Sequence, residues 1–241
     1  GWILGNEIDG CQAEYIRIPY ADTSLHHIPE DIDSDSLVFL SDIFPTGLEV
    51  GVQDGQLSPG QSLAVVGCGP VGLAALMTAK FYSPSRIFAI DNNPHRLQVA
   101  KELGATDIVS NKEGKAVQEI LEITDGVGVD VVIEAIGVPA GWDMSQNLVC
   151  PGGNIAVLGV HGEPGTINLQ EMWRRNFTMT AGLVHTHTIP MLMEQIRVGN
   201  LKPELLMTHS FGLSQVMEAY EAFSQAEQSK SLKVMISNDY L

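Results

Sequence analysis

The 241-residue chain has few basic side chains, few aromatic residues and no long apolar run. Its 13 Lys and Arg residues are outnumbered by 29 Asp and Glu residues, which gives a net charge of −16. This balance argues against a nucleic-acid-binding protein, because phosphates require a basic surface, and it disfavours anionic membranes. No apolar run is long enough to span a bilayer, and the first residues lack the basic and apolar regions of a signal peptide. We therefore expect a protein that acts on small molecules, without nucleic acid or membrane.

Cysteine is also scarce. Cys11, Cys68 and Cys150 are far apart in the sequence and form no C-x-x-C pair. This pattern excludes a disulfide framework and a zinc ribbon within the chain, and it favours a reducing, cytoplasmic environment. At 44% hydrophobic and 17% charged residues, the composition still provides enough apolar material for a core. The length allows one large domain or two small ones.

What the sequence does contain is a glycine-rich turn after an apolar strand. The run Leu63–Val66 ends in the pattern G-x-G-x-x-G, and a helix-forming segment follows. Gly67 permits a sharp turn, Gly69 lets a pyrophosphate approach the backbone, and Gly72 lets the helix pack close to the strand. Pro70 suits the first helical turn, where its missing N–H would have no partner. Free N–H groups and the helix dipole would then face the phosphates.

A second apolar strand ends in Asp91, 19 residues after Gly72. An acid at about this distance binds the adenosine ribose hydroxyls of a dinucleotide. Asp91 favours NAD, because the extra phosphate of NADP would lie against the carboxylate, and Asn92 and Asn93 offer no cation. Arg96 suits either an adenine pocket or a phosphate. The alternative is a glycine turn that only packs a helix.

Strands and helices alternate from Gln61 to about Leu183. This pattern predicts an α/β fold with a doubly wound parallel sheet of six strands in the order 3-2-1-4-5-6. Ligands bind beyond the carboxyl ends of such strands, at the switch point, which places Gly137, Val160 and His161 on the cofactor side.

The flanking segments are less regular. Residues 1–32 are typical of short strands and turns, and residues 33–56 predict a helix that Pro45 breaks or kinks. Pro151-Gly152-Gly153 predicts a turn before the fifth strand. Near the C-terminus, Ser214 is expected to cap a helix.

Taken together, these motifs resemble those of the zinc-dependent medium-chain alcohol dehydrogenases, over nearly the whole chain. The matching segments are Gly5–Tyr15, Leu63–Gly72, Asp91, Arg96–Ala105, Asp130–Gly137, Pro151–Gly153 and His209–Val234. The resemblance implies a six-stranded Rossmann sheet plus an incomplete GroES-like, β-rich catalytic domain. It divides the chain into residues 1–45 from the catalytic domain, an NAD-binding domain over residues 46–183, and residues 184–241 that return to the catalytic domain.

The implied chemistry is reversible hydride transfer between an alcohol and NAD. In that family a zinc ion polarises the alcohol oxygen. Three protein ligands hold the zinc, and a fourth position stays open for the alcohol. Asp42 matches the third ligand, and carboxylate oxygen is a competent zinc donor. Spacing alone favours an acid that caps or solvates a helix, and it is the resemblance that favours a zinc ligand at Asp42. Thr46, one turn later, matches a catalytic-site residue that contacts the nicotinamide.

The resemblance also assigns a set of cofactor-binding residues. Val71 matches a residue packed on the other face of the nicotinamide, the backbone of Leu158 and Val160 lies near the carboxamide, and Lys233 reaches the pyrophosphate. The full set is Gly67, Gly69, Pro70, Val71, Gly72, Asp91, Arg96, Gly137, Leu158, Val160 and Lys233.

One departure matters. The first two zinc ligands of the family, a Cys and a His, lie upstream of everything present here, so we expect a fragment that binds NAD but turns over alcohol poorly or not at all. Two alternatives remain: a zinc-free quinone or enoyl reductase, and a non-catalytic NAD-binding protein. The resemblance further implies a homodimer or homotetramer that pairs through the sixth strand, Phe177–Leu183, with Phe177–Val184 as the pairing segment. The remaining histidines suggest a separate metal site only weakly, and His161 and His185 are candidates to line the cleft.

Overall fold

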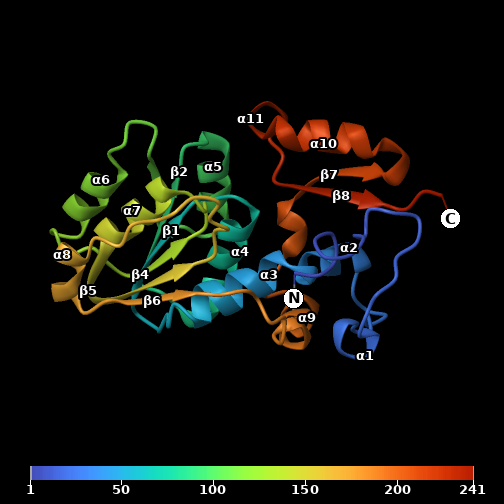
Figure 1. Ribbon diagram of the computed structural model, residues 1–241, viewed down its shortest axis with the longest axis horizontal. Coiled ribbons are helices and arrows are strands. Elements are labelled where there is room, and N and C mark those ends of the chain that lie inside the picture. Colours follow the sequence, from blue (N-terminus) through green and yellow to red (C-terminus); the bar gives the residue numbers. More distant parts are fainter. Residues whose placement is uncertain (1, 241) are drawn as a thin grey trace. The chain divides into compact units, whose positions relative to one another are not determined.

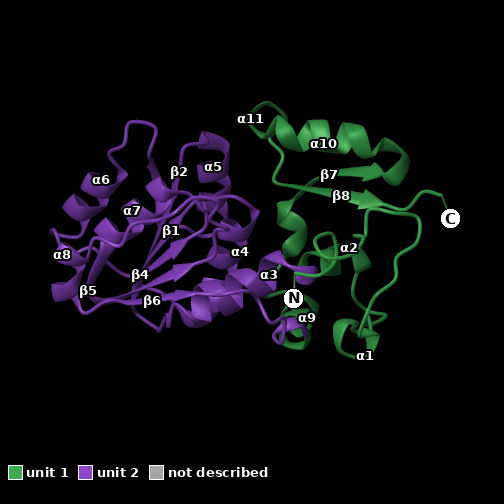
Figure 2. Ribbon diagram, viewed as in Figure 1, with its two compact units in different colours: residues 1–39, 190–241 green, residues 40–189 purple. Residues whose placement is uncertain are grey.

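The computed structural model describes residues 2–240 and divides the chain into two compact units. One unit comprises residues 40–189, and the other combines residues 1–39 with residues 190–241 (Figure 2). Each unit is described by itself below.

The unit of residues 40–189 is built on a six-stranded parallel sheet (Figure 1). Its strands are β1 (Ser62–Val66), β2 (Arg86–Asp91), β3 (Asp107–Ser110), β4 (Val129–Glu134), β5 (Val149–Val157) and β6 (Thr178–Ala181). Their order is β3-β2-β1-β4-β5-β6, as the sequence predicts. The confirmed order places the switch point between β1 and β4, where the crossover direction reverses and ligands bind.

Helices cover both faces of this sheet, because its strands are apolar on both sides. They are α3 (Ile43–Pro45), the π-helix η2 (Thr46–Gln53), α4 (Pro70–Ala79), η3 (Lys80–Tyr82), α5 (Pro94–Leu103), α6 (Ala116–Ile123), α7 (Pro139–Leu148), α8 (Leu169–Met172) and η4 (Trp173–Arg175). Ala64 and Val66 of β1 pack in one core cluster with α6, α7 and α8, including Trp142. Val65 points to the other face, toward Gly72 of α4.

The helical segment before β1 differs from its prediction. Helix α2 (Ser34–Leu37) and the 3-10 turn η1 (Val38–Ser41) end at Asp42, whose φ of −154° and ψ of −74° are not helical. Pro45 keeps helical angles of −59° and −42° and causes no break. It lies in the first turn after Asp42, where a proline removes no intrahelical hydrogen bond. The interruption therefore falls at Asp42, and the helix widens to a π-helix from Thr46.

The Pro151-Gly152-Gly153 segment is also placed differently, since it lies inside β5. The pairing register shifts there: Val129 of β4 pairs with Val149, and the next pair joins Val131 to Asn154. Gly152 has a φ of +78°. The extra residues form a bulge, for which a glycine with positive φ is suited.

The second unit contains the two-stranded parallel sheet of β7 (Met207–Gly212) and β8 (Lys233–Ser237), packed against α10 (Val216–Ser224). Its other elements are α1 (Ala21–Ser24), α2, α9 (Ile189–Arg197), η5 (Pro203–Leu206), η6 (Leu213–Gln215) and α11 (Ala226–Ser229). Residues 2–32 form turns, α1 and one isolated bridge between Leu4 and Ile8, so the strands expected there are wrong. Ser214 does not cap α10, because its hydroxyl and N–H donate to Asp239.

Candidate cofactor site

The glycine-rich turn between β1 and α4 has the geometry that its spacing predicts. Gly67 has a φ of +98°, and a side chain there would meet Ile136 Cγ1 at 2.6 Å. Its N–H donates to the Ile90 carbonyl oxygen at 2.8 Å. A Cβ on Gly72 would overlap the Gly67 carbonyl oxygen. Both positions therefore require glycine for steric reasons, independently of any ligand.

Gly69 is different, because nothing crowds it. It is the N-cap of α4, and no side chain caps that helix end. The nearest atom to a Cβ on Gly69 would be Arg96 Nη1, at 3.9 Å. Pro70 is the first residue of the ten-residue helix. The positive end of α4 is thus open to a ligand over Gly69, which suits an anionic group.

Asp91 lies beside this turn. One carboxylate oxygen accepts the Cys68 N–H at 2.8 Å, and the other accepts the Asn93 N–H at 2.7 Å. Arg96 Nη1 is 4.0 Å from the carboxylate, and Arg96 Nε is buried with no hydrogen-bond partner within residues 2–240. The structure therefore brings together Asp91, Arg96 and the glycine turn, at the carboxyl end of β2.

Cys68 lies in the same turn, but its thiol is unreactive. Its side chain is buried, and burial together with the neighbouring Asp91 charge raises the pKa of the thiol well above its usual range. The thiol donates to the Ile90 carbonyl oxygen at 3.6 Å. A protonated, buried thiol is neither a nucleophile nor a metal ligand.

A second cluster lies at the carboxyl ends of β4 and β5, where Gly137, Leu158 and Val160 are found. The Glu134 side chain is fully buried and accepts the N–H groups of Ile136 and Gly137, both at 2.9 Å. Its other oxygen lies 3.1 Å from His161 Nε2. The sequence analysis placed His161 on this side of the sheet and missed its partner. The signal was Glu134, an acid at the end of the apolar run Val131–Ile133.

Asp42 and Thr46 meet at the start of the helix before β1. Thr46 Oγ1 donates to Asp42 Oδ1 at 2.9 Å, and Thr46 N–H donates to the Asp42 carbonyl oxygen at 2.9 Å. Asp42 is exposed. Within residues 2–240, no group of three or more His, Cys, Asp or Glu side chains is placed to hold a metal ion. These donors do not fit a complete zinc site, since that requires three protein ligands.

Comparison with known proteins agrees with this geometry. Residues 70–197, more than half of the chain, match the family model described as zinc-binding dehydrogenase. The chain belongs to this family. Its zinc-type alcohol dehydrogenase relatives belong to the medium-chain dehydrogenases and reductases, so the predicted resemblance is confirmed.

Three similar proteins show how far the match extends. An alcohol dehydrogenase from Cupriavidus necator is 33% identical over 98% of this chain, which spans 65% of that relative. An NADP-dependent isopropanol dehydrogenase from Entamoeba histolytica is 33% identical over 91% of this chain and 62% of its own length. The solved apo structure of zinc-dependent alcohol dehydrogenase 2 from Streptococcus pneumoniae has a TM-score of 0.93 and 46% identity, over 97% of this chain and 67% of that one. The chain thus spans about two thirds of these relatives.

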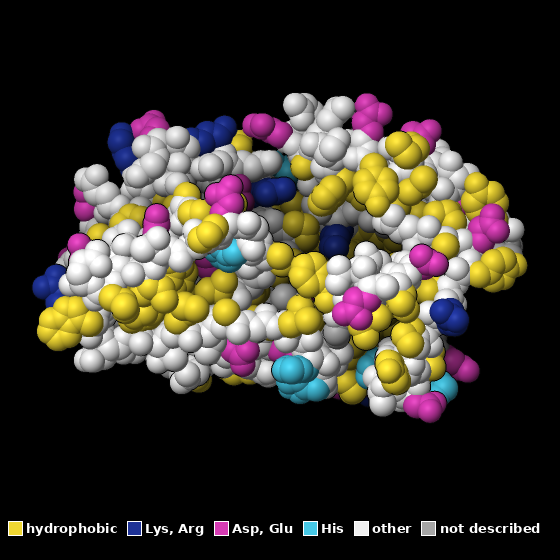
Figure 3. Space-filling model, viewed as in Figure 1, with side chains coloured by type: hydrophobic (Ala, Val, Ile, Leu, Met, Phe, Trp, Pro, Cys, Tyr) yellow, Lys and Arg dark blue, Asp and Glu magenta, His cyan; other side chains and the backbone are white. Residues whose placement is uncertain are grey.

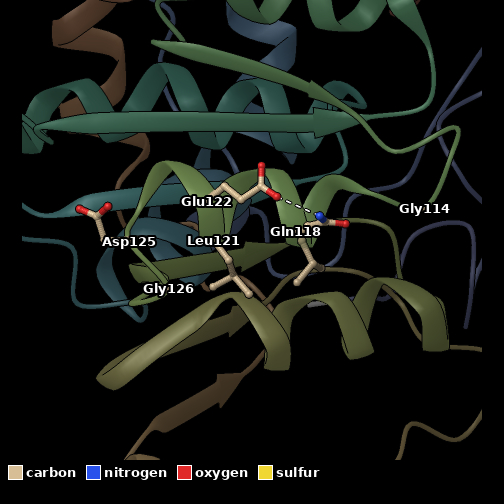
Figure 4. A pocket seen from close by; sticks show the side chains of 7 residues that line it. Gly114, Gln118, Leu121, Glu122, Asp125 and Gly126 are labelled. Carbon is tan, nitrogen blue, oxygen red and sulfur yellow. Dashed lines mark hydrogen bonds between the residues drawn. The ribbon is translucent and has the colours of Figure 1, made fainter.

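Two further features belong to other elements of the chain. Lys233 is on β8, in the other compact unit. A shallow pocket against α6 is lined by Gly114, Val117, Gln118, Leu121, Glu122, Asp125 and Gly126 (Figure 4). It contains none of the predicted site residues. Among the helices of residues 2–240, none is both long and apolar enough for a membrane span.

Proposed function

We propose that this chain carries the NAD-binding part of a zinc-type alcohol dehydrogenase, an enzyme that transfers hydride between a small alcohol and NAD. The observation that supports this most directly is the Asp91 carboxylate fastened beside the open N-terminus of α4. The family membership and the names of the relatives agree with it. A diphosphate would lie over Gly69, and the Asp91 carboxylate would accept hydrogen bonds from the hydroxyls of the adenosine ribose.

NAD rather than NADP is favoured by the surroundings of Asp91. Two backbone N–H groups hold its carboxylate, so it cannot swing away from a phosphate on the ribose. Among residues 2–240, Arg96 is the cation that pairs with this carboxylate, at 4.0 Å, so its charge already faces Asp91. A 2′-phosphate dianion beside Asp91 would be repelled. The NADP dependence named for the isopropanol dehydrogenase relative is therefore not carried over.

The remaining site residues have proposed roles along the cofactor. The turn residues Gly67 and Gly72 shape the diphosphate site, with Pro70 and Val71 in the first turn of α4. Arg96 would flank the adenosine. The contact of Lys233 with the diphosphate stays a prediction from the family resemblance, since Lys233 belongs to the other unit. The nicotinamide end would be formed by Thr46, Gly137, Leu158 and Val160.

Asp42 is proposed as one ligand of a catalytic zinc ion, which would activate the alcohol oxygen when bound. Its partners are not gathered within residues 2–240. We therefore expect the chain by itself to bind NAD but to turn over alcohol poorly or not at all. Alcohol-dependent NADH production by the purified 241-residue chain, abolished by a chelator, would contradict this expectation.

Binding of the cofactor is the direct test of the proposal. NADH should change its fluorescence on titration with the purified chain, and it should bind more tightly than NADPH. Tighter binding of NADPH would instead favour a zinc-free quinone or enoyl reductase. NADH binding without any alcohol turnover by the full-length protein, even with zinc supplied, would favour a non-catalytic NAD-binding protein.

Association through β6 is also proposed. This strand is at one edge of the sheet, and apolar side chains gather on the visible face over α8, β5 and β6 (Figure 3). Among the exposed apolar residues of this region are Ile167, Leu169, Trp173 and Met179. An open edge with an apolar border can pair with a second copy of the sheet. A mass by size-exclusion chromatography with light scattering that corresponds to two or four chains would support this.

A further inference from the structure

Glu134, whose side chain is fully buried, links the two turns that follow β4 and β5. Its Oε1 accepts the N–H groups of Ile136 and Gly137 in the first turn. Its backbone carbonyl oxygen accepts the N–H groups of Leu158 at 2.8 Å and Gly159 at 3.1 Å in the second. A single residue therefore fastens both turns at the switch-point side of the sheet.

The chain leaves room for this carboxyl group with glycines. A Cβ on Gly141 would approach Glu134 Oε1 to 2.6 Å, and a Cβ on Gly159 would approach Oε2 to 2.5 Å. Gly137, with a φ of +78°, faces the second turn directly, because a Cβ there would lie 2.6 Å from the Val160 carbonyl oxygen. The two turns are thus in backbone contact around the Glu134 side chain.

His161 completes the hydrogen bonding of Glu134. The partner of Oε2 within residues 2–240 is His161 Nε2, at 3.1 Å. The imidazole is itself mostly covered, with 22% of its side chain exposed. A buried carboxyl oxygen without a partner is unfavourable. Loss of this contact would therefore release the carboxyl group, the Ile136–Gly137 turn that it holds, and its link to His161 at the end of the second turn.

We propose that His161 is a positioning residue of the cofactor site, which acts through Glu134 to fix the turns Ile136–Gly137 and Leu158–Val160 around the nicotinamide end of NAD. This inference rests on the proposed function, since it assumes that the nicotinamide lies against those turns. It assigns no proton transfer to His161. The adenosine end of the cofactor, at Asp91 and the glycine turn after β1, does not depend on this contact.

The contact through Nε2 allows a matched pair of variants. In His161→Gln the side-chain amide nitrogen takes the place of Nε2 and can still donate to Glu134. In His161→Asn the amide is one bond closer to the backbone, takes the place of Nδ1 and cannot reach. Both are polar substitutions at a partly exposed side chain, so both should fold. His27→Asn, at an exposed residue of the other unit, controls for the loss of an imidazole.

The experiment compares two ligands on the 241-residue chain. NADH reports both ends of the site, whereas ADP-ribose occupies only the adenosine and diphosphate end. We expect His161→Asn to weaken NADH by about tenfold, which corresponds to the loss of one hydrogen bond to a charged or buried group. The affinity of His161→Asn for ADP-ribose should stay within about twofold of that of the unmodified chain. The affinities of His161→Gln and of His27→Asn for NADH and for ADP-ribose should stay within the same range.

The outcomes separate this inference from the proposed function. If the unmodified chain binds neither ligand, the cofactor site itself is wrong and the inference falls with it. If it binds both, the cofactor site stands, and three results overturn the role of His161. The first is a His161→Asn variant that binds NADH as tightly as the unmodified chain. The second is a His161→Asn variant whose affinity for ADP-ribose falls as much as its affinity for NADH. The third is a His161→Gln variant that binds NADH as weakly as His161→Asn.

Discussion

The N–H of Cys68 donates to the Asp91 carboxylate at 2.8 Å, across two neighbouring parallel strands. This hydrogen bond joins the glycine turn after β1 to the acid that ends β2. It holds Asp91 where the ribose of a dinucleotide bound at α4 would lie, and it makes the acid and the turn a single site.

Replacing Asp91 should weaken NADH and relax the discrimination against NADPH. Asp91→Asn keeps the size and one acceptor oxygen but removes the charge that binds the hydroxyls and repels a phosphate. We expect NADH to bind about tenfold to a hundredfold more weakly, as for hydrogen bonds to charged groups, with a smaller loss for NADPH. Parallel fluorescence titrations with both cofactors measure this.

Asp125→Asn serves as the control for that experiment. Asp125 is exposed, distant in sequence, and has a φ of +52°, which asparagine also adopts readily. Its NADH affinity should not change. An Asp91→Asn variant that binds NADH as tightly as this control would contradict the proposed ribose contact.

Two glycines in one turn should respond in opposite ways to alanine. Gly72→Ala places a methyl group against the Gly67 carbonyl oxygen, which is backbone and cannot move aside, so we expect a loss of roughly 2 kcal/mol or more in unfolding free energy. In Gly69→Ala the new methyl group would have no neighbour closer than 3.9 Å, and the φ of −70° suits alanine. The free energy of unfolding should therefore change by no more than about 0.5 kcal/mol.

The same Gly69→Ala variant should nevertheless bind NADH much more weakly, because its methyl group occupies the approach of the diphosphate. Urea unfolding and NADH titration of both variants test the pair. A Gly69→Ala protein that is stable and binds NADH normally would show that the diphosphate does not lie over this residue.

The buried Glu49 should make stability depend on pH. Burial raises the pKa of its carboxyl group, but hydrogen bonds from Thr188 and from the His185 N–H outweigh this and hold the pKa below its usual value. A group with a lowered folded-state pKa stabilises the protein above its unfolded pKa, and the stabilisation is lost as the pH falls through the folded value. Unfolding free energy should therefore drop as the pH falls below about 4.5.

Glu49→Gln tests this source of pH dependence. The amide retains acceptor capacity on one oxygen only, so we expect a loss of about 1–3 kcal/mol at pH 7 and a flatter dependence of stability on pH in the acid range. The comparison is urea unfolding of both proteins between pH 7 and pH 3.5. Parallel curves over that range would mean that Glu49 does not titrate in the way that its hydrogen bonds indicate.

The three thiols should differ in reactivity. Cys11 is exposed, whereas Cys68 and Cys150 are buried, and burial raises the pKa of both thiols. A disulfide reagent that reacts with thiolate should therefore modify Cys11 rapidly, and it should modify Cys68 and Cys150 only when the protein unfolds. Absorbance counting with Cys11→Ser, which should abolish the rapid phase, checks this. A rapid phase that persists in that variant would show that one of the buried thiols is accessible.

Much of the fold followed from local pattern. Short apolar runs indicated the six strands, and their alternation with helices predicted the parallel order that the structure confirms. The prediction that Ser214 caps a helix was wrong, because its hydroxyl donates to Asp239, 25 residues away. The expected break at Pro45 failed because Asp42 ends the preceding helical turn first.

The sequence by itself determined the glycine turn, the acid that follows it and the family, because the spacing along the chain directly encodes a strand, a turn and a helix start. Only the tertiary structure decided which side chains work together. Glu134 and His161 are 27 residues apart and meet because β4 and β5 are neighbours in the sheet, while Glu49 reaches Thr188 over 139 residues. Burial makes each such partner obligatory, and burial is a property of the packed chain that no local pattern contains.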